Sequence, residues 1–415
     1  MRFIDRNIEW IVAIAVLQLS ILLFDNFCRW LFPSIGVIFT LLNYIVLLLM
    51  MSYQLHHYGW KNKSQLFLLF FFIYSIYVLV DMTVYRVYPL HELLGVPIGL
   101  PGFFILTTQI FGYLLCSETI CRKFSFRKFF YLGVLFTLIP ALIFVNIVGV
   151  HYFQFAEWTE ENSALQVTSL TYSNVPLFVM ALLCYDDLSE NKTTSHIVSI
   201  AVLFAVGFVL LMSSRRGPLL WCIVNILICY FYKSRKSLSY VLFVSLLGLV
   251  IYYNIETVLG WISALFPSTG ERIYGSIFEG ATSGRYDADD QERSTYFLGF
   301  NQFLQSPIYG SYFRIITPDM KFRGVYPHNI FIEMLMTMGM LGFIPLCAFL
   351  KKIFINNRYS FKLDKNKLVL FSLFLSSFLQ LQTADTIVVN VWFWVLFGVV
   401  LTISKQNSHS RQLKF

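Results

Sequence analysis

The stretch QLFLLFFFIYSIYVLVDMTV, residues 65–84, decides the fold class of this chain. Asp81 is its only charged residue, and most of the others are large and apolar. A helix of roughly 20 apolar residues crosses the hydrocarbon core of a bilayer, which is about 30 Å thick. The stretch therefore predicts one membrane-spanning helix, and the rest of the chain has to be searched for more of them.

The composition of the whole chain agrees with a membrane protein. Of its 415 residues, 57% are hydrophobic and 13% are charged, and the mean hydropathy is +0.66. A water-soluble domain of this composition would lack the polar surface that it needs. The length allows about a dozen spanning helices and one sizeable connection, so we expect a single integral membrane domain over residues 1–415.

Apolar runs of suitable length recur along the chain and predict an all-α, polytopic fold with about 12 transmembrane helices. The first run is expected to remain as a helix, because residues 24–28, FDNFC, offer no small-residue site for signal-peptide cleavage. The predicted helices cover residues 8–24, 30–52, 65–84, 98–116, 129–150, 164–185, 197–212, 217–232, 238–254, 329–350, 368–384 and 387–403.

The basic residues indicate the topology, because cytoplasmic loops of membrane proteins are enriched in lysine and arginine. The net charge of +8 comes from short basic clusters between the apolar runs, a distribution that does not favour nucleic-acid binding. With both termini in the cytoplasm, most of the 31 basic residues fall on the inner side. The exceptions on the outer side are Arg29, Arg86, Arg215, Arg216, Arg272, Arg285, Arg293, Arg314, Lys321 and Arg323.

The longest connection, residues 257–327, joins predicted helices nine and ten on the outer side. Its many aromatic residues, mixed with glycines and charges, are not typical of a disordered linker. Within it, residues 292–304 carry apolar residues at helical spacing before Ser306 and Pro307 end the pattern. We expect a partly helical outer loop that lies against the membrane's outer surface and roofs a cavity.

Two arginines lie in the short turn between predicted helices seven and eight, on the side where positive charge is otherwise avoided. Arg215 and Arg216 follow Ser213 and Ser214 and precede Gly217. The hydroxyls, the backbone N–H groups of the turn and the start of the next helix together form an anion site suited to a diphosphate. The alternative is that both side chains only extend toward the lipid headgroups.

A third arginine, Arg285, begins the charged stretch RYDADDQER of the long connection. The spacing of its acidic residues is similar to that of a calcium-binding loop, but the glycine and the final glutamate of such a loop are missing from their places. A solvated run of charges is the simplest interpretation of the acidic residues. Arg285 itself could position a phosphate or a sugar.

The long connection ends in Tyr326-Pro327-His328-Asn329, immediately before predicted helix ten. Proline ends the connection, and the helix starts almost at the histidine, where the helix dipole is positive. A positive potential disfavours imidazolium, so we expect a neutral His328 that can accept a proton at pH 7. A hydrogen bond at the membrane interface is its alternative role. Asn329 either orients the imidazole or caps the helix.

Three acidic residues, Asp81, Glu333 and Asp385, lie in or near apolar runs. Acidic residues in spanning helices are rare and usually have a partner inside the protein. Each of the three could pair with an arginine or a tyrosine for structural reasons as readily as it could contact a sugar. None of them is therefore assigned to the site.

The order of these motifs resembles that of the O-antigen ligase and polymerase superfamily. The motifs are Ser-Arg-Arg-Gly at 214–217, Ser-Gly-Arg at 283–285, Ser-Pro-Ile-Tyr-Gly at 306–310, and His-Asn at 328–329 followed by Gly339 and Gly342. The likeness covers predicted helices seven to ten, whereas the first half of the chain agrees only in its series of spanning helices. The doubled arginine and Pro218 depart from the family pattern.

This resemblance implies a metal-independent, inverting glycosyltransferase of the bacterial inner membrane that needs no cofactor and acts on an undecaprenyl-diphosphate-linked glycan at the periplasmic side. By position, His328 would be the general base. The residues implied to bind the donor diphosphate are Arg216, Arg285 and, as a secondary candidate, Arg215, with Asn329 in support. The cysteines, for their part, show no metal-ligand spacing.

The family contains polymerases, which join lipid-linked repeat units, and ligases, which transfer the glycan to lipid A core. We favour a polymerase of O-antigen, capsule or exopolysaccharide units, because polymerases are the more numerous and divergent members. The implied partners are the lipid-linked donor and acceptor, membrane lipids, a chain-length regulator and a flippase. A transporter or lipid-glycan flippase is the alternative from another class. Against it, the long connection has no counterpart in the first half of the chain.

Overall fold

The structure, a computed structural model, consists of helices and their connections in the residues that it describes, and no strand occurs among them. These residues are 1–20, 36–59, 64–85, 100–148, 164–183, 192–212, 216–233, 260–261, 264, 295–311, 313, 315, 327, 329–356, 364–382, 387–388 and 390–412. The all-α prediction is confirmed.

The helices are mostly long, and two of them end in or pass through a π-helical turn, η2 and η4. They are α1 (Arg2–Ser20), α3 (Gly36–Tyr58), α4 (Gln65–Val80), η2 (Asp81–Tyr85), α5 (Leu100–Leu115), α6 (Ser117–Lys123), α7 (Phe126–Gly133), η4 (Val134–Leu138), α8 (Ile139–Val148), α10 (Ala164–Leu183), α11 (Lys192–Met212), α12 (Arg216–Lys233), α17 (Thr295–Gln305), α18 (Ile330–Asn356), α20 (Lys365–Gln380) and α21 (Val391–Gln412).

Each apolar run predicted from the sequence overlaps one of these helices, except the run at 238–254, which lies outside the described residues. Three helical stretches are long and apolar enough to cross a membrane, namely Gln65–Thr83, Phe126–Ile143 and Ile330–Ile355. The count is four if α5 and α6, which meet at an angle of 57°, form one bent span. The structure thus describes a helical protein with several helices able to span a membrane.

The core of the molecule is built around α20 and α21. All residues from 392 to 404 of α21 are buried, as expected of a helix that is surrounded by other helices. Aromatic rings fill the contacts between the helices: the ring of Phe397 lies 4.7 Å from that of Phe67 and 5.3 Å from that of Phe374. The ring of Trp394 lies 4.9 Å from that of Tyr74 on α4.

A buried asparagine joins α12 to α20. The side-chain amide of Asn225 donates hydrogen bonds to the carbonyl oxygen of Ser372 at 3.0 Å and to Oγ of Ser376 at 2.7 Å. Its Oδ1 accepts one from Oγ of Ser372 at 3.1 Å. Hydrogen bonds of this kind between helices are a usual means of association in membrane proteins, where apolar packing alone gives little preference for one partner.

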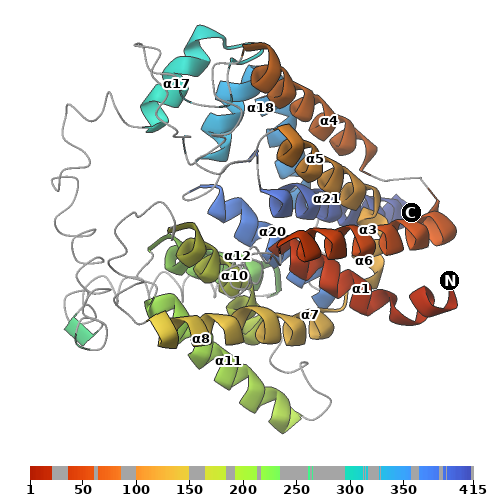
Figure 1. Ribbon diagram of the computed structural model, residues 1–415, viewed down its shortest axis with the longest axis vertical. Helices are drawn as coiled ribbons and strands as arrows, with labels where there is room; N and C mark the ends of the chain where they lie inside the picture. The colour runs from red at the N-terminus through yellow and green to blue at the C-terminus, as the bar shows by residue number, and fades with distance from the viewer. Residues whose placement is uncertain are drawn as a thin grey trace.

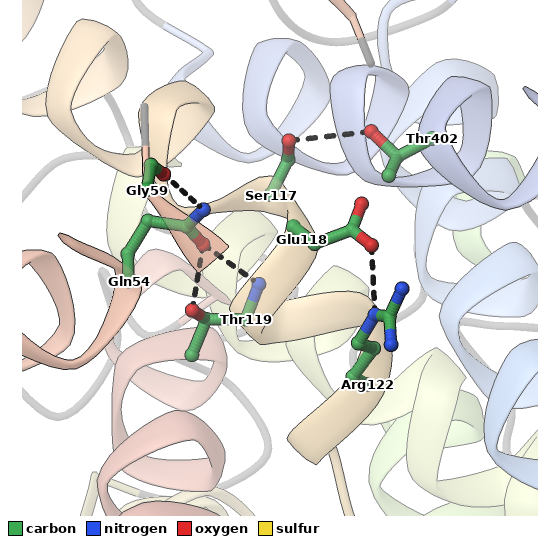
Figure 2. Close-up of polar contacts among 7 residues, drawn as sticks. All are labelled: Gln54, Gly59, Ser117, Glu118, Thr119, Arg122 and Thr402. Atoms are coloured by element: carbon green, nitrogen blue, oxygen red, sulfur yellow. Dashed lines mark hydrogen bonds and ion pairs between the residues drawn. The ribbon is translucent and has the colours of Figure 1, made fainter. Parts of the chain in front are cut away.

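A second polar network holds the bend between α5 and α6 (Figure 2). Oε1 of the buried Gln54 accepts hydrogen bonds from the backbone N–H and the hydroxyl of Thr119, at 3.1 and 2.7 Å. Nε2 of Gln54 donates to the carbonyl oxygen of Gly59 at 3.1 Å. The hydroxyl of Thr402 donates to that of Ser117 at 3.2 Å, so α3, α6 and α21 are fixed to one another at this point.

The chain termini lie at one end of the molecule, and α17 lies at the other (Figure 1). The start of α1 and the last turns of α21 lie together at the right-hand side of Figure 1, and α17 lies at the upper left, against α18. The first turn of α18 follows the His-Asn motif in the sequence. The α17 end of the molecule is therefore where the candidate site has to be sought.

Candidate active site

The helix α18 is broken at Gly339, within the part of the chain that carries the last motifs. Gly339 has φ 59° and ψ −151°, which is not helical and which lies in a region that is populated essentially by glycine alone. The helix resumes immediately after it, so the break separates a first part that starts at Ile330 from a second part that ends at Asn356. Backbone groups that a continuous helix would pair are released at this point.

A segment of the long connection fills the break. The backbone N–H of Met340 donates to the carbonyl oxygen of Pro307 at 2.9 Å, and that of Leu341 donates to Ile308 at 3.1 Å. In the other direction, the N–H of Ser311 donates to the carbonyl oxygen of Met336 at 2.8 Å. The Ser-Pro-Ile-Tyr-Gly motif is thereby attached to α18 by backbone hydrogen bonds on both sides of the break.

Two glycines make this close approach possible. A Cβ atom on Gly310, which has φ 75°, would lie 2.3 Å from the carbonyl oxygen of Thr337. A Cβ atom on Gly339 would lie 2.6 Å from the backbone nitrogen of Gly310. Any larger residue at either position would push the two backbones apart. The motifs at 306–310 and 339, which the sequence showed only as an ordered set, are parts of one structural unit.

Asn329 is the N-cap of α18. Its Oδ1 accepts hydrogen bonds from the backbone N–H groups of Phe331 and Ile332, at 3.0 and 3.2 Å. Of the two roles expected for this residue, the structure thus shows capping. Helix α17 packs over the same turn, because a Cβ atom on Gly299 would lie 3.0 Å from Cγ2 of Ile332.

Two buried carboxylates hold other connections to this end of the molecule. Oε2 of Glu333, which is fully buried, accepts a hydrogen bond from the backbone N–H of Ile387 at 3.1 Å. Oδ2 of Asp81, which is 3% exposed, accepts one from the N–H of Phe313 at 3.2 Å. Neither residue is assigned to the site from the sequence alone, although an acidic residue in an apolar run is itself a sign of a specific role. Asp385 lies outside the described residues.

Several hydroxyl groups near the break have no hydrogen-bond partner among the described protein atoms. They are the side-chain oxygens of Ser306, Ser311 and Thr337. Buried polar groups are nearly always paired with protein or with ordered water, since an unpaired group costs about 1–3 kcal/mol. The surroundings of the break therefore offer hydrogen-bonding capacity that the described chain does not use.

The predicted phosphate-binding arginines and the predicted base are only partly covered by the structure. Arg216 is the first residue of α12, which places it at the positive end of that helix dipole. Arg215, Arg285 and His328 lie outside the described residues, so the meeting of these groups in one site stays a prediction. Among the described residues, no group of three or more His, Cys, Asp and Glu side chains is arranged to hold a metal ion.

The geometry around Gly339 joins the long connection, the start of α18 and two buried carboxylates at one end of the molecule. No family model matches the chain, and no curated protein matches it.

Proposed function

We propose that this chain is a glycosyltransferase that polymerises undecaprenyl-diphosphate-linked oligosaccharide repeat units on the outer face of the bacterial inner membrane. Its topology would comprise about twelve spans, with both termini in the cytoplasm and residues 257–327 connecting two spans on the periplasmic side. The attachment of residues 306–310 in the break of α18 is the observation that carries the proposal. It unites motifs that the superfamily resemblance had grouped by order alone.

The reaction joins an acceptor hydroxyl to the anomeric carbon of the donor glycan. The acceptor oxygen attacks that carbon while His328 takes its proton, and the bond from the carbon to the diphosphate oxygen breaks. The electron pair stays on the lipid diphosphate, whose growing negative charge Arg216 and Arg285 would neutralise through charge-assisted hydrogen bonds. A positioned general base of this kind typically contributes a factor of about 10² to 10⁴ in rate.

The geometry of α18 supports this assignment of the base. Asn329 caps the helix at the positive end of its dipole, and His328 precedes Asn329 in the sequence. The positive potential favours the neutral imidazole that a general base requires. The attachment at Gly339 fixes residues 307–311 of the long connection to the same helix.

The test is turnover of the purified protein on a lipid-linked repeat unit in detergent, in the presence of a metal chelator. His328→Ala should insert normally and lose about two to four orders of magnitude in turnover, because the proton acceptor is gone. The matched control is His56→Ala, an exposed histidine on α3 that the proposal gives no role. A parent that the chelator inactivates, or a His328→Ala variant near the parental rate, would overturn the mechanism.

A ligase that transfers glycan to lipid A core would use the same motifs. The surface glycan of a deletion strain separates the two activities. A single repeat unit on each acceptor indicates that a polymerase has been lost. Bare lipid A core together with accumulated lipid-linked polymer indicates that a ligase has been lost. This result would show that the protein is a ligase and not a polymerase.

The buried carboxylates Asp81 and Glu333 favour a transporter as the second candidate, because acidic residues in spanning helices often carry protons or ions. Each of them, however, accepts a hydrogen bond from a backbone N–H of another segment, which gives it a structural role. If the protein, reconstituted in liposomes, moves a lipid-linked glycan across the bilayer and forms no glycosidic bond, it is a transporter.

A further inference from the structure

We propose that residues 300–311 enter the bilayer as a re-entrant segment, and that its apolar side contacts acyl chains of the leaflet nearest to Asn329. The contact surface, called here the apolar patch, comprises side chains that are between 43% and 63% exposed: Phe300, Leu304, Ile308, Leu341 and Ile344. The inference requires that α18 crosses the membrane, and it does not depend on the enzymatic activity.

The break in α18 lies at membrane depth. Near its other end α18 carries Lys351 and Lys352, whose charges belong at a membrane surface. A helix rises 1.5 Å per residue, so Gly339 lies about 18 Å from Lys351 along the axis. Because the hydrocarbon core is about 30 Å thick, Gly339 lies about 12 Å below the opposite surface. A tilt of the helix would place it deeper still.

The backbone of the long connection reaches the same depth. Inside hydrocarbon, backbone N–H and C=O groups have to be paired within the protein, because water is not available to them. The N–H groups of Met340 and Leu341 find their partners in Pro307 and Ile308, at 2.9 and 3.1 Å. Irregular backbone at this depth is tolerated only where protein covers it, and the reciprocal pairing of the two segments provides that cover.

The distribution of side chains on α17 is the reverse of that on a helix exposed to water. Its buried side contains Gly299 and the polar Gln302, which is 5% exposed. Its exposed side contains Phe300, Leu304 and other large apolar residues. A helix on a water-soluble surface places polar residues outward and apolar residues inward. The reversed pattern is expected where the outside is lipid.

The sequence around the segment is compatible with entry into hydrocarbon and return from it. No charged residue occurs from 294 to 313, and the run is bounded by Arg293 and Arg314. A run of this length is too short for two full crossings and long enough for a helix, a turn and a return. The charges at both ends would stay at the membrane surface.

The exposed surface of the segment continues onto α18, which identifies the lipid as its partner. Leu341 follows the break, and its N–H is bonded to Ile308, so these two exposed residues are neighbours. Ile344 lies almost one turn further along the same helix. An apolar surface of this kind, on a helix able to span a membrane, is expected to face acyl chains.

The experiment uses single cysteines in a full-length chain whose seven native cysteines are replaced by alanine. Leu304→Cys and Ile308→Cys are the test variants, Leu341→Cys is the control on the spanning helix, and Lys365→Cys, the exposed first residue of α20, is the control in water. The proteins are placed in lipid nanodiscs, where a charged maleimide reaches both faces. We expect loss of labelling at 304 and 308, as at 341, and ready labelling at 365.

A second measurement identifies what covers the patch. A fluorophore attached in detergent at Leu304→Cys or Ile308→Cys should lose intensity in nanodiscs that contain nitroxide-labelled phosphatidylcholine, as it should at Leu341→Cys. Labelling as rapid as at Lys365→Cys would show that the segment lies in water and would overturn the proposal. Slow labelling without quenching by the nitroxide lipid would show that protein covers the patch, and this result would overturn it as well.

Discussion

Replacing Gly339 with alanine should destabilise the protein strongly, because two independent costs coincide at this residue. Its backbone, at φ 59° and ψ −151°, lies in a region where residues other than glycine cost about 1–3 kcal/mol. In addition, the new methyl group would lie 2.6 Å from the backbone nitrogen of Gly310 and 2.6 Å from the carbonyl group of Ile308. These are backbone atoms, which cannot rotate away as the end of a side chain can.

Relief of this clash requires the long connection to move away from α18. The movement would break the hydrogen bonds from Met340 to Pro307 and from Leu341 to Ile308. A buried polar group left without its partner costs about 1–3 kcal/mol. Added to the conformational cost at Gly339, the loss of these two bonds gives a destabilisation of about 3 kcal/mol at the least.

Two other glycines separate the contributions. Gly59 also has a positive φ, 64°, but nothing lies within 4 Å of its added Cβ, so Gly59→Ala measures the backbone cost alone. Gly207 lies in α11, and the nearest atom to its added Cβ is 3.9 Å away, so Gly207→Ala carries neither cost. The assay is the midpoint of thermal unfolding in detergent, followed as loss of the monodisperse peak in size-exclusion chromatography.

The midpoint should be highest for Gly207→Ala and the parent, lower for Gly59→Ala and lowest for Gly339→Ala. Since the midpoint falls as the free energy of unfolding falls, the order follows from the costs just given. A Gly339→Ala protein that unfolds at the temperature of Gly59→Ala would refute the reasoning. It would mean that residues 306–311 can leave the break without loss of stability, and that the attachment is weak.

Three further changes test other parts of the structure. Asn329→Ala removes the cap of α18 and should cost about 1 kcal/mol of stability, whereas Asn329→Asp keeps a cap acceptor and should cost less. Equal unfolding midpoints for the two variants would contradict the capping role. Gln54→Leu leaves the buried N–H and hydroxyl of Thr119 without their acceptor, at about 1–3 kcal/mol for each group, and an unchanged midpoint would contradict the network of Figure 2. Arg216→Lys should lower glycosyl transfer far more than Arg215→Lys at equal protein levels, because lysine keeps the charge and loses the planar fork; equal activity of Arg216→Lys and the parent would remove Arg216 from the site.

The helices could be predicted from the sequence because their cause is local. The run at 65–84 is apolar on all sides, which only a spanning or fully buried helix can use, and α4 with η2 covers it. The ends of the helices were predicted less accurately. The predicted helix at 329–350 continues to Asn356 in α18, because lysines are good helix formers and the change from apolar to charged residues does not end a helix.

The break at Gly339 could not be predicted, because its cause is not local. In the sequence, Gly339 is one small residue in an apolar run, and glycine is common in spanning helices. Only the approach of Gly310 from the long connection explains why the helix opens there. The sequence predicted that residues 292–304 are partly helical, and α17 confirms this. It could not predict that the residues after α17 pair with the middle of another helix.

For the candidate site, the sequence supplied motifs, and it did not supply the contacts that surround them. Asn329 was recognised as a candidate cap, since asparagine before an apolar run is a common helix start. The partners of the acidic residues could not be predicted. Glu333 accepts a hydrogen bond from the N–H of Ile387 and Asp81 accepts one from that of Phe313, and both donors lie on segments remote in the sequence. Because the acceptor is a side chain and the donor is backbone, no complementary residue type marks the pair.

The break divides α18 into two parts with different surroundings, and this division bears on how the site is held. In the second part, the ring of Phe349 packs against those of Phe67 and Phe70 on α4, at 5.4 and 5.7 Å, and thus belongs to the aromatic core. The first part, which begins at the cap Asn329, is covered by α17 and attached to the long connection. A continuous helix would have tied the orientation of its first turn to the core. With glycine at 339, the first part is oriented by its own contacts, which are those with the long connection, the hydrogen bond of Glu333 to the N–H of Ile387 and the packing of Phe331 against Phe378 on α20. The connection that carries the motifs therefore takes part in positioning the start of the helix on which the proposed base depends.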